Sequence, residues 1–140
     1  GAGKSTLMKI ITCYLEQDSG RVQVCNLDTQ EQDILVKSKI GYLPENNPLY
    51  HDMYIKEYLS FVGNMYKRNN LKKRVSEIIE QTGLSTEQGK RIRELSKGFK
   101  QRVGLAAALI HNPKIFEVFH ISFTILKRLP LLIQCYQQNL

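Results

Sequence analysis

The sequence predicts an α/β fold in which a parallel sheet is interrupted by an inserted helical subdomain. Three observations support this prediction. A glycine-rich turn opens the chain and leads into a segment with apolar residues at helical spacing. Residues 40–43 form a short apolar run that Pro44 stops, which is typical of a buried strand. From about residue 54 to residue 112, three further segments carry apolar residues at helical spacing.

The first third of the chain is expected to alternate short helices and strands. Helical spacing of apolar residues predicts helices, alternation predicts a strand, and Asp, Asn, Ser and Gly mark turns. The expected elements are a helix over residues 4–15, a turn over 18–20, a strand over 21–25 that ends at 26–28, a short helix over 30–38, the strand over 40–43 and a loop over 45–53. The apolar residues of the first helix are Leu7, Ile10, Ile11 and Tyr14.

Three helices are expected after that loop. The apolar face of the first consists of Ile55, Tyr58, Leu59, Val62, Met65 and Tyr66. The second runs over residues 71–81 and stops at Gly83, because glycine commonly ends a helix. The third begins at Ser96 and ends at Pro113. The pattern assigns no clear element to residues 86–93.

The composition is that of an ordinary globular chain of 140 residues with a formal net charge of +7. Its three cysteines, Cys13, Cys25 and Cys135, are widely spaced and form no metal-binding pattern, which fits a reducing cytoplasm. The basic residues gather on predicted amphipathic helices, so we expect a solvated face and no nucleic-acid partner. Charges and a proline interrupt the apolar residues 115–134, so any membrane role is expected to come through a partner.

The opening residues carry a phosphate-binding pattern. Gly3, Lys4 and Ser5 match the end of G-x-x-x-x-G-K-[ST]. Glycine lets backbone N–H groups point at phosphate oxygens, and the helix that follows adds its positive end. Lys4 is expected to reach the β- and γ-phosphates, and Ser5 to ligate Mg²⁺ through its hydroxyl. The predicted nucleotide-binding residues here are Gly1, Ala2, Gly3, Lys4, Ser5 and Thr6. The alternative is a glycine-rich turn that only caps a helix.

A second candidate anion site precedes the last predicted helix. Ser96 and Gly98 stand at its N-terminus, where backbone N–H groups are free, although Ser96 also reads as an ordinary N-cap. Residues 95–113 resemble the signature segment of ATP-binding-cassette (ABC) ATPases, whose commonest form is L-S-G-G-Q. Here Lys97 and Phe99 occupy the third and fifth places. In that family the segment contacts the γ-phosphate bound to the other subunit, so the resemblance adds Ser96 and Gly98 to the predicted nucleotide-binding residues.

The resemblance to ABC ATPases implies an incomplete P-loop NTPase core, with a RecA-like parallel sheet and an α-helical subdomain over about residues 50–110. Residues 40–44 resemble the strand that enters the family's Q-loop, which usually offers a Gln to Mg²⁺ and to the attacking water. Glu45 occupies that place and is expected to ligate Mg²⁺ through oxygen. The alternative is an exposed loop acid. Residues 41–50 and 95–111 further resemble the gliding-motility-associated exporter type.

The resemblance stops after residue 114. The family continues with four apolar residues and then Asp-Glu, which hold Mg²⁺ and polarise the attacking water. Here Val118 is followed by Phe119, which cannot ligate magnesium, and by His120, which could in principle accept a proton. Glu117 lies two and three residues short of the expected acids. No residue is therefore assigned a certain catalytic role, and Glu45 is the one candidate near the reacting groups.

We expect residues 1–114 to form a partial ABC nucleotide-binding domain, and residues 115–140 to be a divergent tail in place of the Walker B region. The D-loop, the switch His, the first strand and the adenine-stacking aromatic of the family have no match. The chain begins without Met and inside the phosphate-loop pattern, so its start is expected to be missing. A truncated gene model, a frameshift near residue 114 or a degraded gene copy is favoured over divergence into a non-hydrolysing protein.

Three functions follow as alternatives. By resemblance, the intact protein is the ATP-binding subunit of an exporter. It binds and hydrolyses Mg-ATP, pairs head-to-tail with a second ATP-binding subunit, and drives a transmembrane permease from the cytoplasmic face of the cell membrane. The second alternative is a catalytically dead fragment or interaction module, because the Asp-Glu pair is absent. The third is another phosphate-loop enzyme, such as a small kinase, in which the signature helix would have no role.

Overall fold

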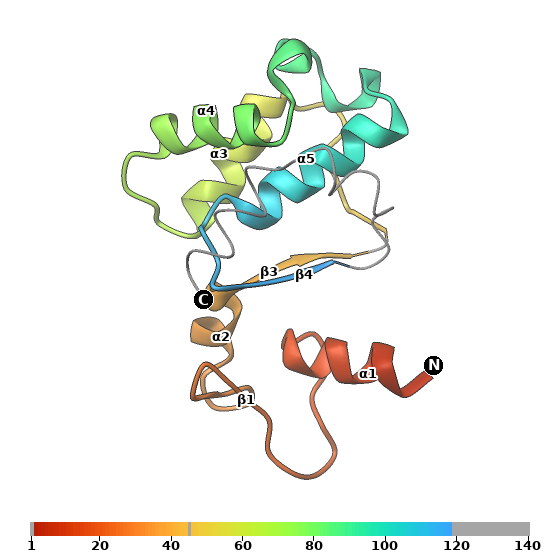
Figure 1. Ribbon diagram of the computed structural model, residues 1–140, viewed down its shortest axis with the longest axis vertical. Helices are drawn as coiled ribbons and strands as arrows, with labels where there is room; N and C mark the ends of the chain where they lie inside the picture. Colours follow the sequence, from red (N-terminus) through yellow and green to blue (C-terminus); the bar gives the residue numbers. More distant parts are fainter. Residues whose placement is uncertain (1, 45, 119–140) are drawn as a thin grey trace.

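The computed structural model describes residues 2–44 and 46–118, with only the backbone of Ala2, Lys4 and the last strand. Its elements are α1 (Ala2–Ile11), β1 (Gln23–Val24), β2 (Leu27–Asp28), α2 (Asp33–Lys39), β3 (Ile40–Leu43), α3 (Ile55–Met65), α4 (Leu71–Gln81), the 3₁₀ turns Ser85–Glu87 and Ile92–Glu94, α5 (Lys97–Leu109) and β4 (Ile115–Val118). Figure 1 shows their arrangement. Within the described ranges, no helix has the length and hydropathy that a membrane crossing requires.

Strands β3 and β4 form a parallel pair that organises the fold. Ile40 pairs with Ile115, and the register continues to Leu43 and Val118. Parallel neighbours need a long crossover connection. Here that connection contains α3, α4 and α5, which lie together on one side of the strand pair, while α1 lies on the other (Figure 1). The predicted α/β fold with a helical insertion is confirmed.

The three helices of the insertion share one hydrophobic core, and we call them the helical unit. The apolar face predicted for α3 points into this core, apart from the exposed Met65 and Tyr66 at its end. Helix α4 buries Val75, Ile78 and Ile79 in the same core. At Gly63 an added Cβ would collide with the end of the Leu71 side chain and come within 3.3 Å of Ile110, so a larger residue there would force Leu71 to move. The buried residues of the core include Leu43, Ile55, Tyr58, Leu59, Val62, Val75, Ile78, Ile79, Leu84, Ile92, Leu95, Val103, Leu105, Leu109 and Ile110.

The segment without a predicted element, residues 86–93, folds back onto the start of α3. The N–H of Ile92 donates to the carbonyl of Met53 at 3.0 Å, and the N–H of Arg93 donates to that of His51 at 2.9 Å. These hydrogen bonds join residues about forty positions apart, so no local periodicity of the sequence predicts them. They place the start of α5 next to the start of α3 in the helical unit.

The expectations for residues 21–28 were wrong in detail. Residues 26–28 do not simply end a strand, because β2 turns back antiparallel to β1 with Val24 opposite Leu27. Cys25 and Asn26 make the turn with φ of +51° and +62°, as a two-residue hairpin with a type I′ turn requires. The strand predicted over residues 21–25 is accordingly shorter.

The first helix begins and ends earlier than expected. It covers Ala2–Ile11 rather than residues 4–15, and Cys13 beyond it has a left-handed φ of +56° that stops the helix. Leu7 and Tyr14, which the pattern placed on an apolar face, are 50% and 75% exposed.

Candidate functional site

The first turn of α1 contains the predicted phosphate-binding residues. The first N–H groups of any helix lack partners within it, and they carry the positive end of its dipole. Gly3 is exposed, and an added Cβ there would meet nothing within 4 Å, so the backbone of this turn is open to a ligand. Ser5 is half-buried and Thr6 is exposed. The prediction for Gly1 and for the side chain of Lys4 falls outside the described residues.

A cavity of about 610 Å³ lies beside this turn. It brings Ser5 together with the end of β3 and the loop that follows, as the resemblance to the Q-loop implies. In the sequence, Glu45 stands between the lining residues Pro44 and Asn46, but it is outside the described part of the chain. The volume is within the range of small-molecule sites, about 300–1,000 Å³. Its lining residues are Ser5, Lys9, Tyr14, Tyr42, Pro44, Asn46 and Pro48.

The first turn of α5 contains the signature residues. Ser96 caps the helix with φ −62° and ψ 161°, and its Oγ accepts the N–H of Phe99 at 3.3 Å. The predicted start of this helix is therefore confirmed. Lys97 and Gly98 are exposed, and a Cβ on Gly98 would meet nothing within 4 Å. The turn is open to a second molecule.

The two candidate phosphate sites lie apart within one chain. Helix α1 lies on one side of the β3–β4 pair and α5 on the other, and the starts of the two helices are separated (Figure 1). The structure therefore brings Ser5 to the loop after β3, but it does not bring Ser96 and Gly98 to Ser5.

Strand β4 stands where the resemblance places the strand before Asp-Glu. It pairs in parallel with β3, and Glu117 lies opposite Tyr42 in the register. The side chain of Glu117 is not described, and Phe119, His120 and the rest of the predicted tail lie outside the described residues. Within residues 2–44 and 46–118, no cluster of three or more His, Cys, Asp or Glu could hold a metal ion. The expected Mg²⁺ site, with few protein ligands, needs no such cluster.

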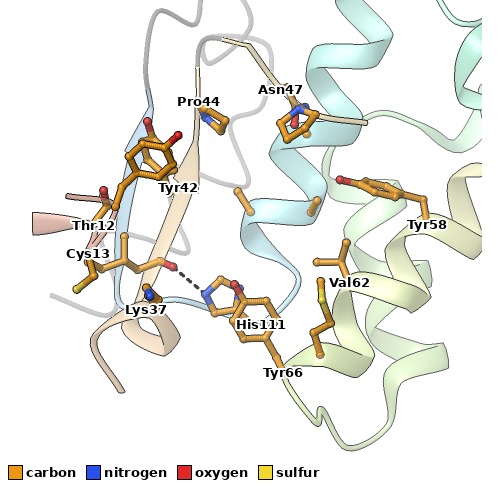
Figure 2. Close-up of a pocket in the computed structure, with 17 residues that line it drawn as sticks. Thr12, Cys13, Lys37, Tyr42, Pro44, Asn47, Tyr58, Val62, Tyr66 and His111 are labelled. Atoms are coloured by element: carbon orange, nitrogen blue, oxygen red, sulfur yellow. Dashed lines mark hydrogen bonds between the residues drawn. The ribbon is translucent and has the colours of Figure 1, made fainter. Parts of the chain in front are cut away.

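Sequence reasoning missed a buried histidine at the junction of the helical unit and the strand pair. His111 is 7% exposed, and its Nε2 lies 3.0 Å from the carbonyl oxygen of Ile40. Its ring stacks on Tyr66 with centroids 4.0 Å apart and planes 7° apart. Burial lowers the pKa of His111 from its ordinary value. Figure 2 shows this pair in the wall of a second cavity of about 490 Å³.

Solved structures share this fold over nearly the whole chain. A dimeric bacterial ABC transporter cassette, MJ0796, superposes with a TM-score of 0.83 at 24% identity, covering 99% of this chain and 66% of that one. An ATP-binding subunit of an ABC transporter gives a TM-score of 0.80 at 21% identity, covering 99% and 59%. The fold is that of a P-loop NTPase of the ABC type.

The sequence model of the family described as "ABC transporter" matches residues 1–117, and the chain belongs to this family. It is 36% identical over 118 residues to the ABC transporter ATP-binding protein NatA of Bacillus subtilis. The aligned region covers 82% of this chain and 48% of NatA. It is 35% identical to the linearmycin resistance ATP-binding protein LnrL of the same species, covering 82% and 38%. The chain thus spans about half the length, or less, of these curated relatives.

Proposed function

We propose that the chain is part of the ATP-binding subunit of an ABC transporter, and that it binds Mg-ATP at the first turn of α1. The observation that carries the proposal is the cavity that joins Ser5 to the loop after β3. An open glycine-containing turn at the positive end of a helix suits phosphate oxygens. We propose residues 1–114 as the partial nucleotide-binding domain, and residues 115–140 as a divergent tail.

In this proposal, residues 1–6 bind the phosphates and Mg²⁺ together with Glu45. The backbone of Gly1, Ala2, Gly3 and Thr6 and the Lys4 ammonium hold the phosphates, and the hydroxyl of Ser5 and the carboxylate of Glu45 ligate Mg²⁺. Bound Mg²⁺ neutralises the charge of the phosphates. Ser5 fits this role because it lines the cavity, and the neighbours of Glu45 line the same cavity.

We further propose a head-to-tail pair of ATP-binding subunits. Ser96 and Gly98 form an open helix start, yet they lie apart from Ser5 in the same chain (Figure 1). One nucleotide can touch both turns only if a second chain supplies one of them. Among the structural neighbours, MJ0796 is described as dimeric, and cbiO1 of Clostridium perfringens as part of the cbiONQ transporter complex. A transmembrane permease is the proposed membrane partner, and we propose that the subunit binds it at the cytoplasmic face of the membrane.

The phosphate-loop assignment is tested by measuring Mg-ATP binding to Lys4→Ala. Loss of the ammonium group removes its attraction for the phosphates, so binding should be abolished. Lys56→Ala removes one exposed charge from α3 and serves as the matched control, which should bind as the unmodified chain does. If Lys4→Ala binds Mg-ATP normally, the assignment is wrong.

A second candidate function is a nucleotide-binding domain that does not hydrolyse ATP. The observation in its favour is that β4 ends at Val118 and the next residues are Phe119 and His120, where the family places Asp-Glu. Without a carboxylate at that place, no general base is supplied there to the attacking water. ATP turnover by the 140-residue chain, lost in Lys4→Ala, would exclude this candidate.

The exporter type is a finer proposal. Residues 41–50 and 95–111 support the gliding-motility-associated type, while the curated relatives named above have other names: NatA and LnrL. A gene-deletion strain that loses surface gliding, with motility restored by the intact gene, would support this type. Unchanged gliding would exclude it.

A further inference from the structure

The C-terminal end of α5 is joined to the strand pair by a histidine that lacks a partner on one ring nitrogen. A carbonyl oxygen can only accept, so Nε2 of His111 carries the hydrogen and donates it to Ile40, the first residue of β3. Nδ1 is then the bare acceptor nitrogen. It is buried, and no described group pairs with it. His111 is therefore held as a neutral imidazole in one tautomer.

The contacts around His111 come from both sides of the junction. From the helical unit, Tyr66 stacks on the ring and follows the last residue of α3. On the strand side, the ring contacts Ile40, and in the following segment the N–H of Lys114 donates to the carbonyl of Lys39 at 2.8 Å, directly before β3. The hydrogen bond from His111 to Ile40 thus closes a short bridge between the two parts of the fold.

The charged groups near His111 disfavour a second proton. Burial lowers the pKa of His111 most strongly, the hydrogen bond to Ile40 raises it by less, and Arg68 after α3 and Arg74 on α4 lower it further. Lys37 of α2 and Cys13 line the same cavity (Figure 2). Within the described residues, no carboxylate pairs with the ring. A proton on Nδ1 would put a buried positive charge where neither an acceptor nor a counter-charge stands.

We propose that His111 is a pH-sensitive latch between the helical unit and the strand pair. In its neutral form the ring holds Ile40 and stacks on Tyr66. Protonation at Nδ1 makes Nε2–H a stronger donor, but the larger cost of burying the charge drives the ring toward water. The bond to Ile40 then breaks, and the end of α5 is held less tightly on β3. The step is a reversible proton transfer from solvent.

The latch has a consequence at the opposite end of α5. This helix has 13 residues, so about 20 Å separates His111 from Ser96 and Gly98. A loosened C-terminal end lets the whole helix tilt against the strand pair. This tilt would change the position of the signature turn relative to a second chain. Only that consequence rests on the proposed function. The latch itself does not.

The proposal is tested first on the unmodified 140-residue chain, by NMR titration of its histidine rings and backbone amides. His111 should titrate below the ordinary histidine value of about 6.5, with Nε2 protonated throughout. The amides of Ile40 and Lys114 should shift with the midpoint of His111, while those of Val75 and Ile79 inside α4 stay unchanged. The proposal fails if His111 titrates at or above about 6.5, if the junction amides do not follow it, or if all amides change together.

A pair of variants gives an independent test without nucleotide. His111→Phe keeps an aromatic ring on Tyr66 but cannot donate to Ile40 or titrate, whereas His51→Gln removes an exposed histidine. Between pH 7.5 and 5.5 the unmodified chain and His51→Gln should lose thermal stability in parallel, and His111→Phe should lose clearly less. Parallel loss in all three would overturn the latch. If His111→Phe does not fold, the NMR titration alone decides.

Discussion

The guanidinium of Arg74 on α4 donates to two carbonyl groups at the C-terminal end of α5, to Leu109, its last residue, at 2.7 Å and to the C-cap residue Ile110 at 3.1 Å. Carbonyls at a helix C-terminus have no partner within the helix, and a planar guanidinium can satisfy two at once. The Arg74 side chain is 15% exposed, so this pairing is largely shielded from water. It fixes α4 against the end of α5.

Arg74→Ala should therefore destabilise the chain by about 1.5–3 kcal/mol, the usual range for a hydrogen bond to a charged group. Arg74→Lys should lose part of this stabilisation, because a single ammonium group does not reproduce the two parallel hydrogen bonds of the guanidinium. Lys73→Ala is the matched control on the neighbouring position, with its side chain 80% exposed and one long ion pair, and it should change stability by less than about 0.5 kcal/mol. Equal urea midpoints for Arg74→Ala and Lys73→Ala would contradict the capping role.

Gly104 on α5 is expected to tolerate no side chain. An added Cβ would overlap the side chain of Asn47 and come within 2.8 Å of Leu43, so the helix lies directly on β3 and the loop after it. Gly104→Ala should cost about 1–3 kcal/mol by overpacking. Gly89→Ala, where a Cβ meets nothing within 4 Å, should leave the thermal midpoint almost unchanged. A stable Gly104→Ala would show that Asn47 moves aside freely.

The sequence predicted those elements whose signals are local. Strand β3 has the predicted bounds because its apolar run ends at Pro44, and α4 has the predicted bounds because an amphipathic pattern is followed by Gly83. The hairpin at Cys25 and Asn26 was not predicted, because a type I′ turn is usually recognised by a glycine and this turn has none.

The candidate site was only partly predictable for the same physical reason. The phosphate loop is a local pattern, so Ser5 could be named from the sequence. Ser5 shares a cavity with Pro44 and Asn46 because segments far apart in the sequence pack together in the fold. Only the family resemblance indicated this proximity. No local pattern assigns His111 its buried position, because its partners, Ile40 and Tyr66, lie far away in the sequence.

Asp28 should make stability depend on pH in the acid range. Its carboxylate accepts the N–H groups of Gln30 at 2.9 Å and Glu31 at 3.2 Å, and these hydrogen bonds lower its pKa, with a smaller contribution from Arg21. A lowered folded-state pKa adds stability above the unfolded value of about 3.9, and this stability is lost as pH falls through the folded value.

Asp28→Asn keeps an acceptor oxygen but cannot titrate, so its urea midpoint should fall less between pH 6 and pH 3 than that of the unmodified chain. The matched control is Asp18→Asn, which removes one carboxylate from an exposed turn. The prediction fails if the midpoint of Asp28→Asn has the same pH dependence as the midpoint of the unmodified chain.

Ser96 and Gly98 allow stability and proposed function to be separated. Ser96→Ala removes the N-cap of α5 and should cost about 1 kcal/mol, whereas Ser76→Ala on the exposed face of α4 should cost little. Gly98→Ala should leave stability nearly unchanged, because its Cβ meets nothing within 4 Å.

If the first turn of α5 closes over a nucleotide held by a second chain, Gly98→Ala should still weaken self-association in Mg-ATP, because its methyl group stands where the phosphate must approach. Sedimentation velocity with and without Mg-ATP measures this directly. A chain that pairs only with Mg-ATP, and a Gly98→Ala variant that remains folded but does not pair, would support the head-to-tail arrangement. Equal pairing of Gly98→Ala and the unmodified chain would mean that this turn faces no phosphate in the assembly, and α5 would then serve only to pack the helical unit.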